Sequence, residues 1–184
     1  MTCLAAGVQE GYGQRSGEMI VANEIDLQNL LKGGHNMFLD TLALGNDEIF
    51  LRLYRTAKAD PQRGYVPAYY FYICKTDDQT EIGCCDLRIG HNENTYYGGN
   101  IGYEIYKPYR GHHYAAKACQ LLFDLARKHE MGYLIITCSP TNIASRKTCE
   151  NAGCRLKEVA QLPPHNEMYR AGETEKCIYV IDLD

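Results

Sequence analysis

The segment from Pro108 to Ala115 contains residue types that can bind an anion. It lies between a predicted strand and a predicted helix. The backbone N–H groups at the start of a helix have no intrahelical acceptor, so together with the helix dipole they can hold a negative charge. Arg110 can add a positive charge. The segment contains neither the G-x-x-x-x-G-K-[ST] pattern of a nucleotide P-loop nor the G-x-G-x-x-G of a dinucleotide site, so by itself it does not identify a ligand.

Cysteine and histidine, the other reactive residue types, predict no metal site. The nine cysteines stand at positions 3, 74, 84, 85, 119, 138, 149, 154 and 177 and include no C-x-x-C pair. Most lie in apolar runs, so we expect small buried thiols in a reducing cytosol rather than a disulfide framework. His112 and His113 are adjacent and cannot share one face of a helix, so they do not form a helical zinc pair.

The spacing of apolar residues predicts the elements that position the loop. Three N-terminal stretches are predicted to be helical, namely residues 24–32, 36–44 and 47–58. Strands are predicted over residues 68–74, 81–89, 101–106, 133–138, 154–160 and 176–183. Two further helices are predicted over residues 114–129, where an apolar stripe opposes a charged one, and 143–152, where Asn142 is the predicted N-cap.

This order of elements predicts one domain over residues 1–184, with residues 1–18 poorly ordered. The predicted fold class is mixed α+β, with a mostly antiparallel sheet of about six to seven strands and helices on both faces. The helix at 114–129 forms one β-α-β crossover if the strands that it joins are parallel. Ligands of open sheets bind at the carboxyl ends of such strands, which directs attention to residues 104–115 and 138–145.

Two short motifs in a fixed order carry a resemblance to a known family. Gly102-Tyr103-Glu104-Ile105 is followed by Arg110-Gly111-His112-His113-Tyr114-Ala115, and Asn142-Ile143-Ala144-Ser145 runs on to Asn151-Ala152-Gly153. The first resembles the acyl-CoA pyrophosphate loop (Arg/Gln-x-x-Gly-x-Gly/Ala) of the GNAT superfamily of N-acetyltransferases, and the second resembles that superfamily's Asn-x-x-Ser motif. The resemblance extends from Tyr69 through Leu183, and the tail from Tyr169 is similar to a bacterial subgroup with undefined substrates.

The resemblance implies an acetyl-CoA-dependent N-acetyltransferase in which a primary amine attacks the acetyl group directly, in a ternary complex. Glu104 is the implied general base. The backbone of Ile105, Tyr106 and Lys107 is implied to bind the pantetheine arm and to polarise the carbonyl. The other residues implied to bind acetyl-CoA are Arg110, Gly111, His112, His113, Tyr114, Ala115, Asn142 and Ser145.

The chain departs from the family pattern at two positions. His113 stands where the family usually has glycine, at a position that often needs an unusual backbone conformation, and histidine tolerates positive φ better than most residues. Cys149 stands where many relatives have a tyrosine proposed as the acid for the leaving thiolate, so no dedicated acid is identified. Cys149 as an acylated nucleophile is the poorer alternative, because a thiol inside a helix is more often a buried one.

Composition and charge limit the classes of molecule that the protein is expected to bind. The 19 Lys and Arg residues against 23 Asp and Glu give a net charge of −4, which disfavours a nucleic-acid binder. We find no signal-peptide pattern at the start and no apolar run long enough to span a membrane, so we expect a cytoplasmic protein. The acceptor is expected to be the amine of a small molecule or a peptide, bound by residues from 30–67 and 161–172. Whether the chain forms a homodimer stays open.

Two other functions also stay open. His113, Cys149 and the missing acid suit a catalytically silent acyl-CoA-binding or sensing module, and the loop alone also suits a binder of another phosphate ligand. Among acceptors for an acetyltransferase, peptide N-termini, polyamines, amino acids and aminoglycosides are all compatible with the sequence.

Overall fold

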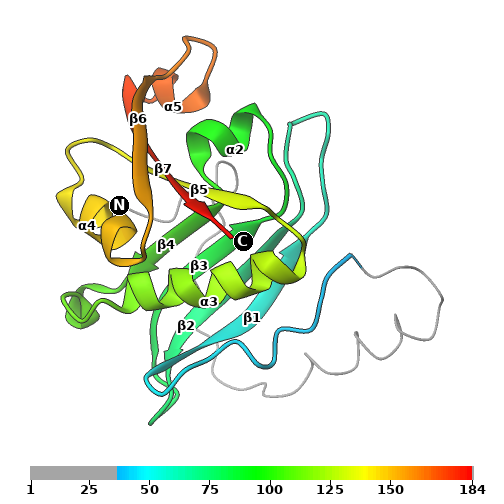
Figure 1. Ribbon diagram of the computed structural model, residues 1–184, viewed down its shortest axis with the longest axis vertical. Helices are drawn as coiled ribbons and strands as arrows, with labels where there is room; N and C mark the ends of the chain where they lie inside the picture. Colours follow the sequence, from blue (N-terminus) through cyan, green and yellow to red (C-terminus); the bar gives the residue numbers. More distant parts are fainter. Residues whose placement is uncertain (1–36, 184) are drawn as a thin grey trace, which may run out of the picture. The chain divides into compact units, whose positions relative to one another are not determined.

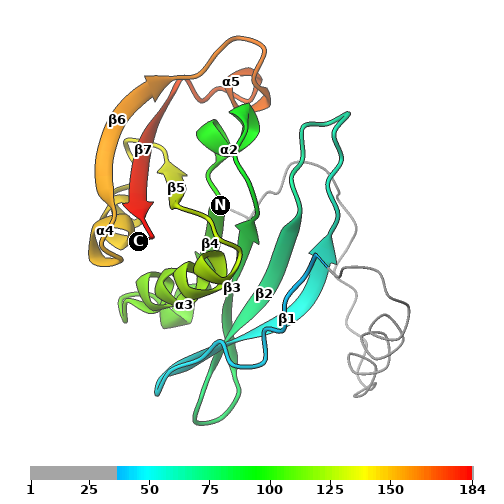
Figure 2. The same ribbon diagram turned by 45° about the vertical axis from the view of Figure 1, so that its right-hand side comes forward.

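The computed structural model describes residues 37–183, and those from Thr41 onward belong to one compact unit. Figures 1 and 2 show its elements from two sides. The strands are β1 (Ile49–Ala57), β2 (Ala68–Lys75), β3 (Glu81–Arg88), β4 (Ile101–Ile105), β5 (Tyr133–Cys138), β6 (Arg155–Gln161) and β7 (Glu175–Asp182). The helices are α2 (Glu93–Gly98), α3 (Tyr114–Lys128), α4 (Ile143–Asn151) and α5 (Glu167–Arg170), with a 3-10 helix η1 (Lys107–Tyr109) before α3.

The first sheet has the strand order β1-β2-β3-β4, and every neighbouring pair is antiparallel. In β2, Tyr69, Phe71 and Ile73 are fully buried, whereas Tyr70 and Tyr72 on the other face are half-buried. α3 contacts β1, β3 and β4 and packs on the buried face. The predicted apolar stripe of α3 is confirmed, because all of its residues are buried: Ala115, Ala118, Cys119, Leu122, Leu125 and Ala126.

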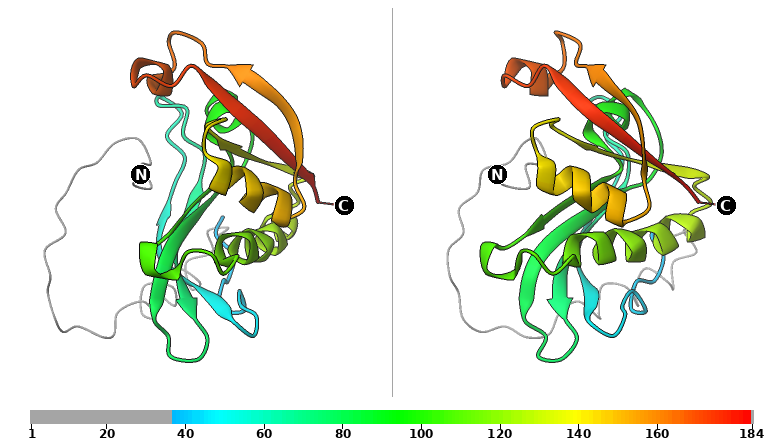
Figure 3. Two further views of the ribbon diagram at one scale, coloured as in Figure 1. Left: turned by 90° about the vertical axis from the view of Figure 1, so that its left-hand side faces the viewer. Right: turned by 60° about the vertical axis from the view of Figure 1, so that its left-hand side comes forward.

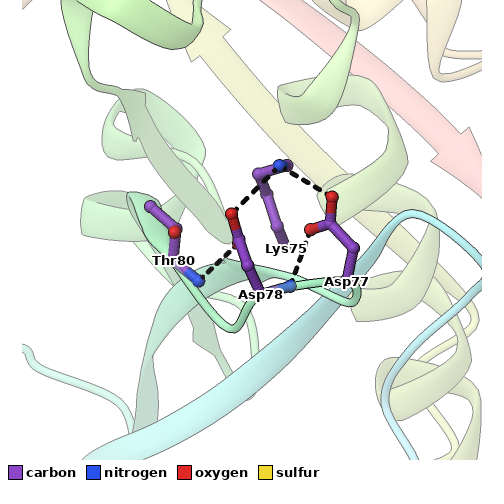
Figure 4. A network of polar contacts seen from close by, with 4 residues as sticks. All are labelled: Lys75, Asp77, Asp78 and Thr80. Carbon is purple, nitrogen blue, oxygen red and sulfur yellow. Dashed lines mark hydrogen bonds and ion pairs between the residues drawn. The ribbon is translucent and has the colours of Figure 1, made fainter.

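Polar side chains hold the turn that joins β2 to β3, as Figure 4 shows. The ammonium of Lys75 lies 2.9 Å from Asp77 Oδ2 and 3.4 Å from Asp78 Oδ2. The backbone N–H of Thr80 donates to Asp78 Oδ1 over 3.0 Å, and hydrogen bonds from Thr80 lower the pKa of Asp78 to about 2. Because a hairpin turn sets strand register, this turn determines which residues of β3 face β2.

The second sheet has the strand order β5-β7-β6 and is antiparallel throughout. On one face, Ile135, Ile178 and Val180 pack with Tyr96 and Tyr97 of α2. On the other face, β5 contacts α4, and the thiols of Cys138 in β5 and Cys149 in α4 are both buried. Helices therefore cover both faces of β5, which explains its continuous apolar sequence.

Asn100 joins the two sheets just before β4 begins. Its side chain is fully buried. Its backbone N–H donates to the Ile135 carbonyl over 2.6 Å, and its Oδ1 accepts the Ile135 N–H over 3.0 Å. Its Nδ2 donates to the carbonyls of Arg88 (3.1 Å) and Gly90 (2.8 Å). One amide therefore satisfies backbone groups from both sheets.

β4 and β5 diverge from this junction, as Figure 3 shows. Gly99, with φ +79°, lies so close to β5 that a Cβ there would be 3.2 Å from the Thr137 nitrogen. Beyond Asn100, β4 pairs with β3 alone among the residues that the structure describes. The predicted mixed, mostly antiparallel fold is confirmed, with seven strands between residues 37 and 183. The strands form two sheets because the β4–β5 pairing stops after this contact.

Two of the predicted N-terminal helices are wrong. Most of the stretch 47–58 is strand β1, because Ile49 and Leu51 alternate with outward residues and are buried against β2. Residues 37–44 form turns and bends instead of a helix. Conversely, α2 and α5 lie where the sequence predicts loops. The predicted helix at 24–32 and the predicted poor order of residues 1–18 fall outside the described residues, and the single-domain expectation for 1–184 stays a prediction.

Replacing Asn100 by alanine is expected to lower the free energy of unfolding by roughly 3 kcal/mol, because a buried N–H and buried carbonyls lose their partners. Asn94→Ala is the matched control, since the Asn94 amide also bonds two carbonyls but in an exposed place. It should cost less than about 1 kcal/mol. Urea unfolding followed by circular dichroism measures the free energy of unfolding of both variants. Equal losses of free energy would show that the buried Asn100 amide stabilises the protein no more than the exposed Asn94 amide.

Candidate active site

The loop between β4 and α3 has a left-handed backbone at two positions. Gly111 has φ +93°, and His113 has φ +60° and ψ +16°. The unusual conformation expected for His113 is therefore confirmed. His113 is the N-cap residue of α3 but makes no side-chain cap hydrogen bond, and its Nδ1 instead lies 3.1 Å from Asn151 Nδ2. The first N–H groups of α3 thus keep their capacity to bind an anion.

A surface pocket of about 290 Å³ lies beside this helix start. Its lining residues come from the start of α3 and the end of α4: His113, Ala116, Lys117, Gln120 and Asn151. The ammonium of Lys117 lies 2.5 Å from Glu48 Oε1. Glu48 neutralises this ammonium, so the positive potential beside the pocket comes from the N–H groups and dipole at the start of α3, which suit a phosphate-bearing ligand.

One edge of β4 has no partner strand within residues 37–183. The Tyr106 N–H donates to the Ile82 carbonyl of β3. Because hydrogen-bonded pairs alternate along an antiparallel ladder, Glu104 also bonds to β3 through its backbone. The backbone groups of Tyr103 and Ile105 therefore point away from β3, toward the side on which β4 and β5 diverge. Such an edge can hydrogen-bond an extended ligand that carries amide groups.

Arg110 folds back onto the end of β4. Its Nε donates to the Ile105 carbonyl over 2.8 Å, and its Nη2 lies 3.9 Å from Glu104 Oε1. The structure therefore places Arg110 beside the implied general base, where its guanidinium can orient the carboxylate.

Glu104 lies on the face of the first sheet opposite α3. Its partner on β3 is Cys84, which in turn pairs with Tyr72 of β2. The side chain of Glu104 is 24% exposed. A partly exposed carboxylate and the Ile105 N–H on the open edge thus stand one residue apart, and a carboxylate in such a place can accept a proton from a bound amine.

α4 begins at the predicted N-cap, which is confirmed, because Asn142 Oδ1 accepts the Ser145 N–H over 3.1 Å. The Tyr103 hydroxyl reaches α4 from β4 and lies 2.8 Å from Ser145 Oγ and 3.8 Å from Cys149 Sγ. Burial raises the pKa of Tyr103, so this hydroxyl keeps its proton. Asn142 and Ser145 thus both have hydrogen-bond partners within the protein, and their contact with a cofactor stays a prediction.

Cys149 is fully buried, as expected for a thiol inside a helix. Interaction with the Cys138 thiol and burial raise the pKa of Cys149, whereas the same interaction lowers the pKa of Cys138. The eight cysteines within residues 37–183 are free thiols, and all of them except Cys84 are buried. The structure therefore supplies no exposed nucleophilic thiol in α4.

Sequence reasoning did not identify Tyr103, Lys117 and Cys138 as neighbours of the site. Strand alternation placed Tyr103 on the face opposite Glu104, but its contacts come from α4, about forty residues later, and no local pattern predicts them. The sequence could have indicated that Lys117 lies near the loop, because Lys117 stands one turn after His113 on the same side of a predicted helix.

Within residues 37–183, no three His, Cys, Asp or Glu side chains are grouped so that they could hold a metal ion. In the same stretch, no helix is long and apolar enough to cross a membrane. The features that converge are an uncapped helix start, an open strand edge and a carboxylate at the end of that strand.

Comparison with known protein families identifies the family of this chain. Residues 41–155, more than half of the chain, match the family model of the acetyltransferase (GNAT) domain. The chain belongs to the GNAT acetyltransferase family. GNAT proteins are N-acetyltransferases that use acetyl-CoA, and the resemblance carried by the two motifs is confirmed.

Solved structures of GNAT proteins share the fold at low sequence identity. A ribosomal-protein-S5-alanine acetyltransferase from Vibrio fischeri is 19% identical, with a TM-score of 0.51 over 64% of this chain and 62% of that one. The microcin C7 self-immunity acetyltransferase MccE, solved with acetyl-CoA and AMP, is 21% identical, with a TM-score of 0.51 over 62% of this chain and 61% of that one.

An acetyltransferase from Salmonella typhimurium that modifies the N-terminal serine of ribosomal protein L7/L12 is 20% identical, with a TM-score of 0.50 over 67% of each chain. This GNAT chain thus spans less than two thirds of the Vibrio fischeri and MccE structures. No curated protein sequence matches it significantly.

The residues of this GNAT domain fit acetyl-CoA. The uncapped start of α3 and the adjoining pocket suit a pyrophosphate, and the Tyr103 backbone with the Ile105 N–H on the open edge suits the amides of a pantetheine arm. Of the backbone groups predicted to bind this arm, the Tyr106 N–H is bonded to β3 and the Ile105 carbonyl to Arg110. The residues predicted to bind the cofactor at Gly111, His112, Tyr114 and Ala115 lie at this helix start.

Ala115→Leu is expected to weaken acetyl-CoA binding by about tenfold or more, which corresponds to about 1.4 kcal/mol. The added side chain would obstruct the approach to the N–H groups of α3. Arg110→Ala should change the affinity less than about threefold, because the contacts of Arg110 are with Glu104 and Ile105. Titration calorimetry measures both, with circular dichroism to verify folding, and an unchanged affinity in folded Ala115→Leu would move the cofactor site elsewhere.

Proposed function

We propose that this GNAT chain transfers the acetyl group of acetyl-CoA to a primary amine of a small molecule or a peptide. The observation that carries the proposal is the arrangement at the end of β4. There the carboxylate of Glu104 stands next to an open backbone edge at Ile105, and the same chain continues into the uncapped start of α3. Family membership gives the reaction class, and the fold neighbour MccE was solved with acetyl-CoA.

In the proposed mechanism, each part of the site has one task. When bound, acetyl-CoA supplies the activated thioester. The N–H groups at the start of α3 hold its pyrophosphate, and the backbone of Tyr103 and Ile105 holds the extended arm, so that the acceptor amine can attack directly in a ternary complex. Holding both partners in register can contribute roughly 7–11 kcal/mol, the larger share of the acceleration.

Glu104 removes the proton of the acceptor ammonium. Its carboxylate lies on the outer face of the sheet, and Arg110, with its Nη2 3.9 Å from Glu104 Oε1, orients it. Loss of such a base typically costs about 10²–10⁴-fold in turnover. Arg110 is in this view a positioning residue, since it acts on Glu104 and does not touch the reacting atoms.

A panel of amines incubated with acetyl-CoA tests the function, with release of the free thiol as the readout. The panel contains peptides, polyamines, amino acids and aminoglycosides. Thiol release with at least one class supports the proposal. Acetyl-CoA binding without thiol release from any class would support the silent binding module, and thermal stabilisation by ATP or NAD but not by acetyl-CoA would contradict both.

Glu104→Gln is expected to lower kcat by about 10²–10⁴-fold, because the amide keeps the shape of the side chain but cannot accept the proton. Initial rates of thiol release measured across the pH range test this.

Glu175→Gln is the matched control, because Glu175 is also a strand glutamate but lies on β7 of the other sheet, bonded to Gln161. It should keep near-native turnover. Near-native turnover of Glu104→Gln at every pH would remove Glu104 from the mechanism without contradicting acetyl transfer.

A further inference from the structure

The face of the first sheet opposite α3, here the outer face, carries two rows of residues that cross all four strands. The register of the strands gives the rows, which are Arg52, Tyr72, Cys84 and Glu104, and next to it Arg55, Tyr70, Asp86 and Gly102. Residues paired directly across antiparallel strands point to the same face. An irregularity in β1 brings Tyr54 onto the outer face as well, with its ring 4.5 Å from that of Tyr72.

Tyrosine and arginine form the part of the outer face that lies over β1 and β2. The guanidinium of Arg55 lies 4.0 Å from the centre of the Tyr70 ring, and that of Arg52 lies 5.5 Å from the Tyr72 ring. The exposed fraction of Tyr54 is 48%. Guanidinium groups that stack on rings keep their N–H groups free to bind a carboxylate at the rim of the ring.

The charge of the outer face changes sign between its two edges. Glu104 stands on β4, whereas Arg52 and Arg55 stand on β1. Arg52 forms an ion pair with Glu81, but Arg55 belongs to no ion pair within residues 37–183. Between the two edges, Asp86 is buried and its charge is balanced by Arg88 at 3.0 Å. The charge of Arg55 also acts on Asp86, although the two form no ion pair. A ligand therefore meets the carboxylate of Glu104, with Arg110 beside it, at one edge and the guanidinium of Arg55 at the other.

We propose that the outer face binds the N-terminal segment of an acidic peptide as the acceptor, with its amino group at Glu104 and an acidic side chain at Arg55. This inference rests on the proposed function. Neighbouring strands lie about 4.8 Å apart, so the three steps from β4 to β1 span about 14 Å. An extended peptide advances about 3.4 Å per residue, so an acidic side chain at its fourth or fifth position reaches Arg55.

The same distances and charges discriminate among the acceptors that the sequence leaves open. A free amino acid has its carboxylate too close to its amine to contact Glu104 and Arg55 together. Polyamines and aminoglycosides carry further positive charges, which Arg55 repels. The tyrosines between the two edges provide a flat surface for the peptide between its two charged contacts.

Three peptides that differ only at positions four and five test the proposal, with glutamate, glutamine or lysine at both. The wild-type protein should acetylate the glutamate peptide with a kcat/KM about tenfold above that of the lysine peptide, mostly through KM. Arg55→Gln should abolish this preference, and Arg55→Glu should invert it. The inversion is a gain for the lysine peptide, so misfolding of the variant cannot produce it.

Arg155→Glu is the matched control, because Arg155 is also an exposed strand arginine but lies on β6 of the other sheet. It should leave the preference for glutamate unchanged. Equal rates for the three peptides, or an Arg155→Glu effect as large as that of Arg55→Glu, would overturn the proposal. Acetylation of other amines but of no peptide would overturn it while sustaining the proposed function, and absence of thiol release with every amine would overturn both.

Discussion

The buried amide of Asn100 is the contact through which β4 and β5 meet, and the geometry of the candidate site depends on where that contact ends. Before this point, Gly99 has a positive φ and lies so close to β5 that a Cβ there would require the Thr137 backbone to shift. After it, β4 continues with β3 as its partner and leaves its other edge open. A buried amide is suited to this role because it donates and accepts at the same time and leaves no backbone group of the junction unsatisfied.

Close packing of β3 against β4 then fixes the open edge in place. A Cβ on Gly83 would lie 2.2 Å from the Glu104 carbonyl oxygen, and one on Gly102 would lie 2.4 Å from Asp86 Oδ1. Gly83 is therefore required by the backbone of β4, whereas a side chain at Gly102 would have to displace the Asp86 carboxylate. The backbone of Glu104 is held against β3, and this leaves the adjacent peptide groups directed toward the other side.

Strand alternation divides the functions of β4 between its two faces and its edge. Tyr103 points toward α4 and bonds Ser145, Glu104 points to the outer face, and the backbone of Ile105 lies on the open edge where Arg110 reaches it. A cofactor at the edge and an acceptor on the outer face would thus meet at the end of this one strand. The left-handed His113 then directs the chain into α3 without adding a capping side chain.

The sequence alone determined the strands from Ala68 onward, helix α3 with its buried stripe, the N-cap of α4 and the family motifs, because these features depend on alternation, capping and residue order over short distances. It failed for residues 37–58, where burial of Ile49 and Leu51 against β2 overrode a local pattern that resembled a helix. Only the tertiary structure decided the division into two sheets, the position of Arg110 beside Glu104 and the reach of Tyr103 to α4. Each of these depends on contacts between segments or on side-chain conformations that no local pattern of residues encodes.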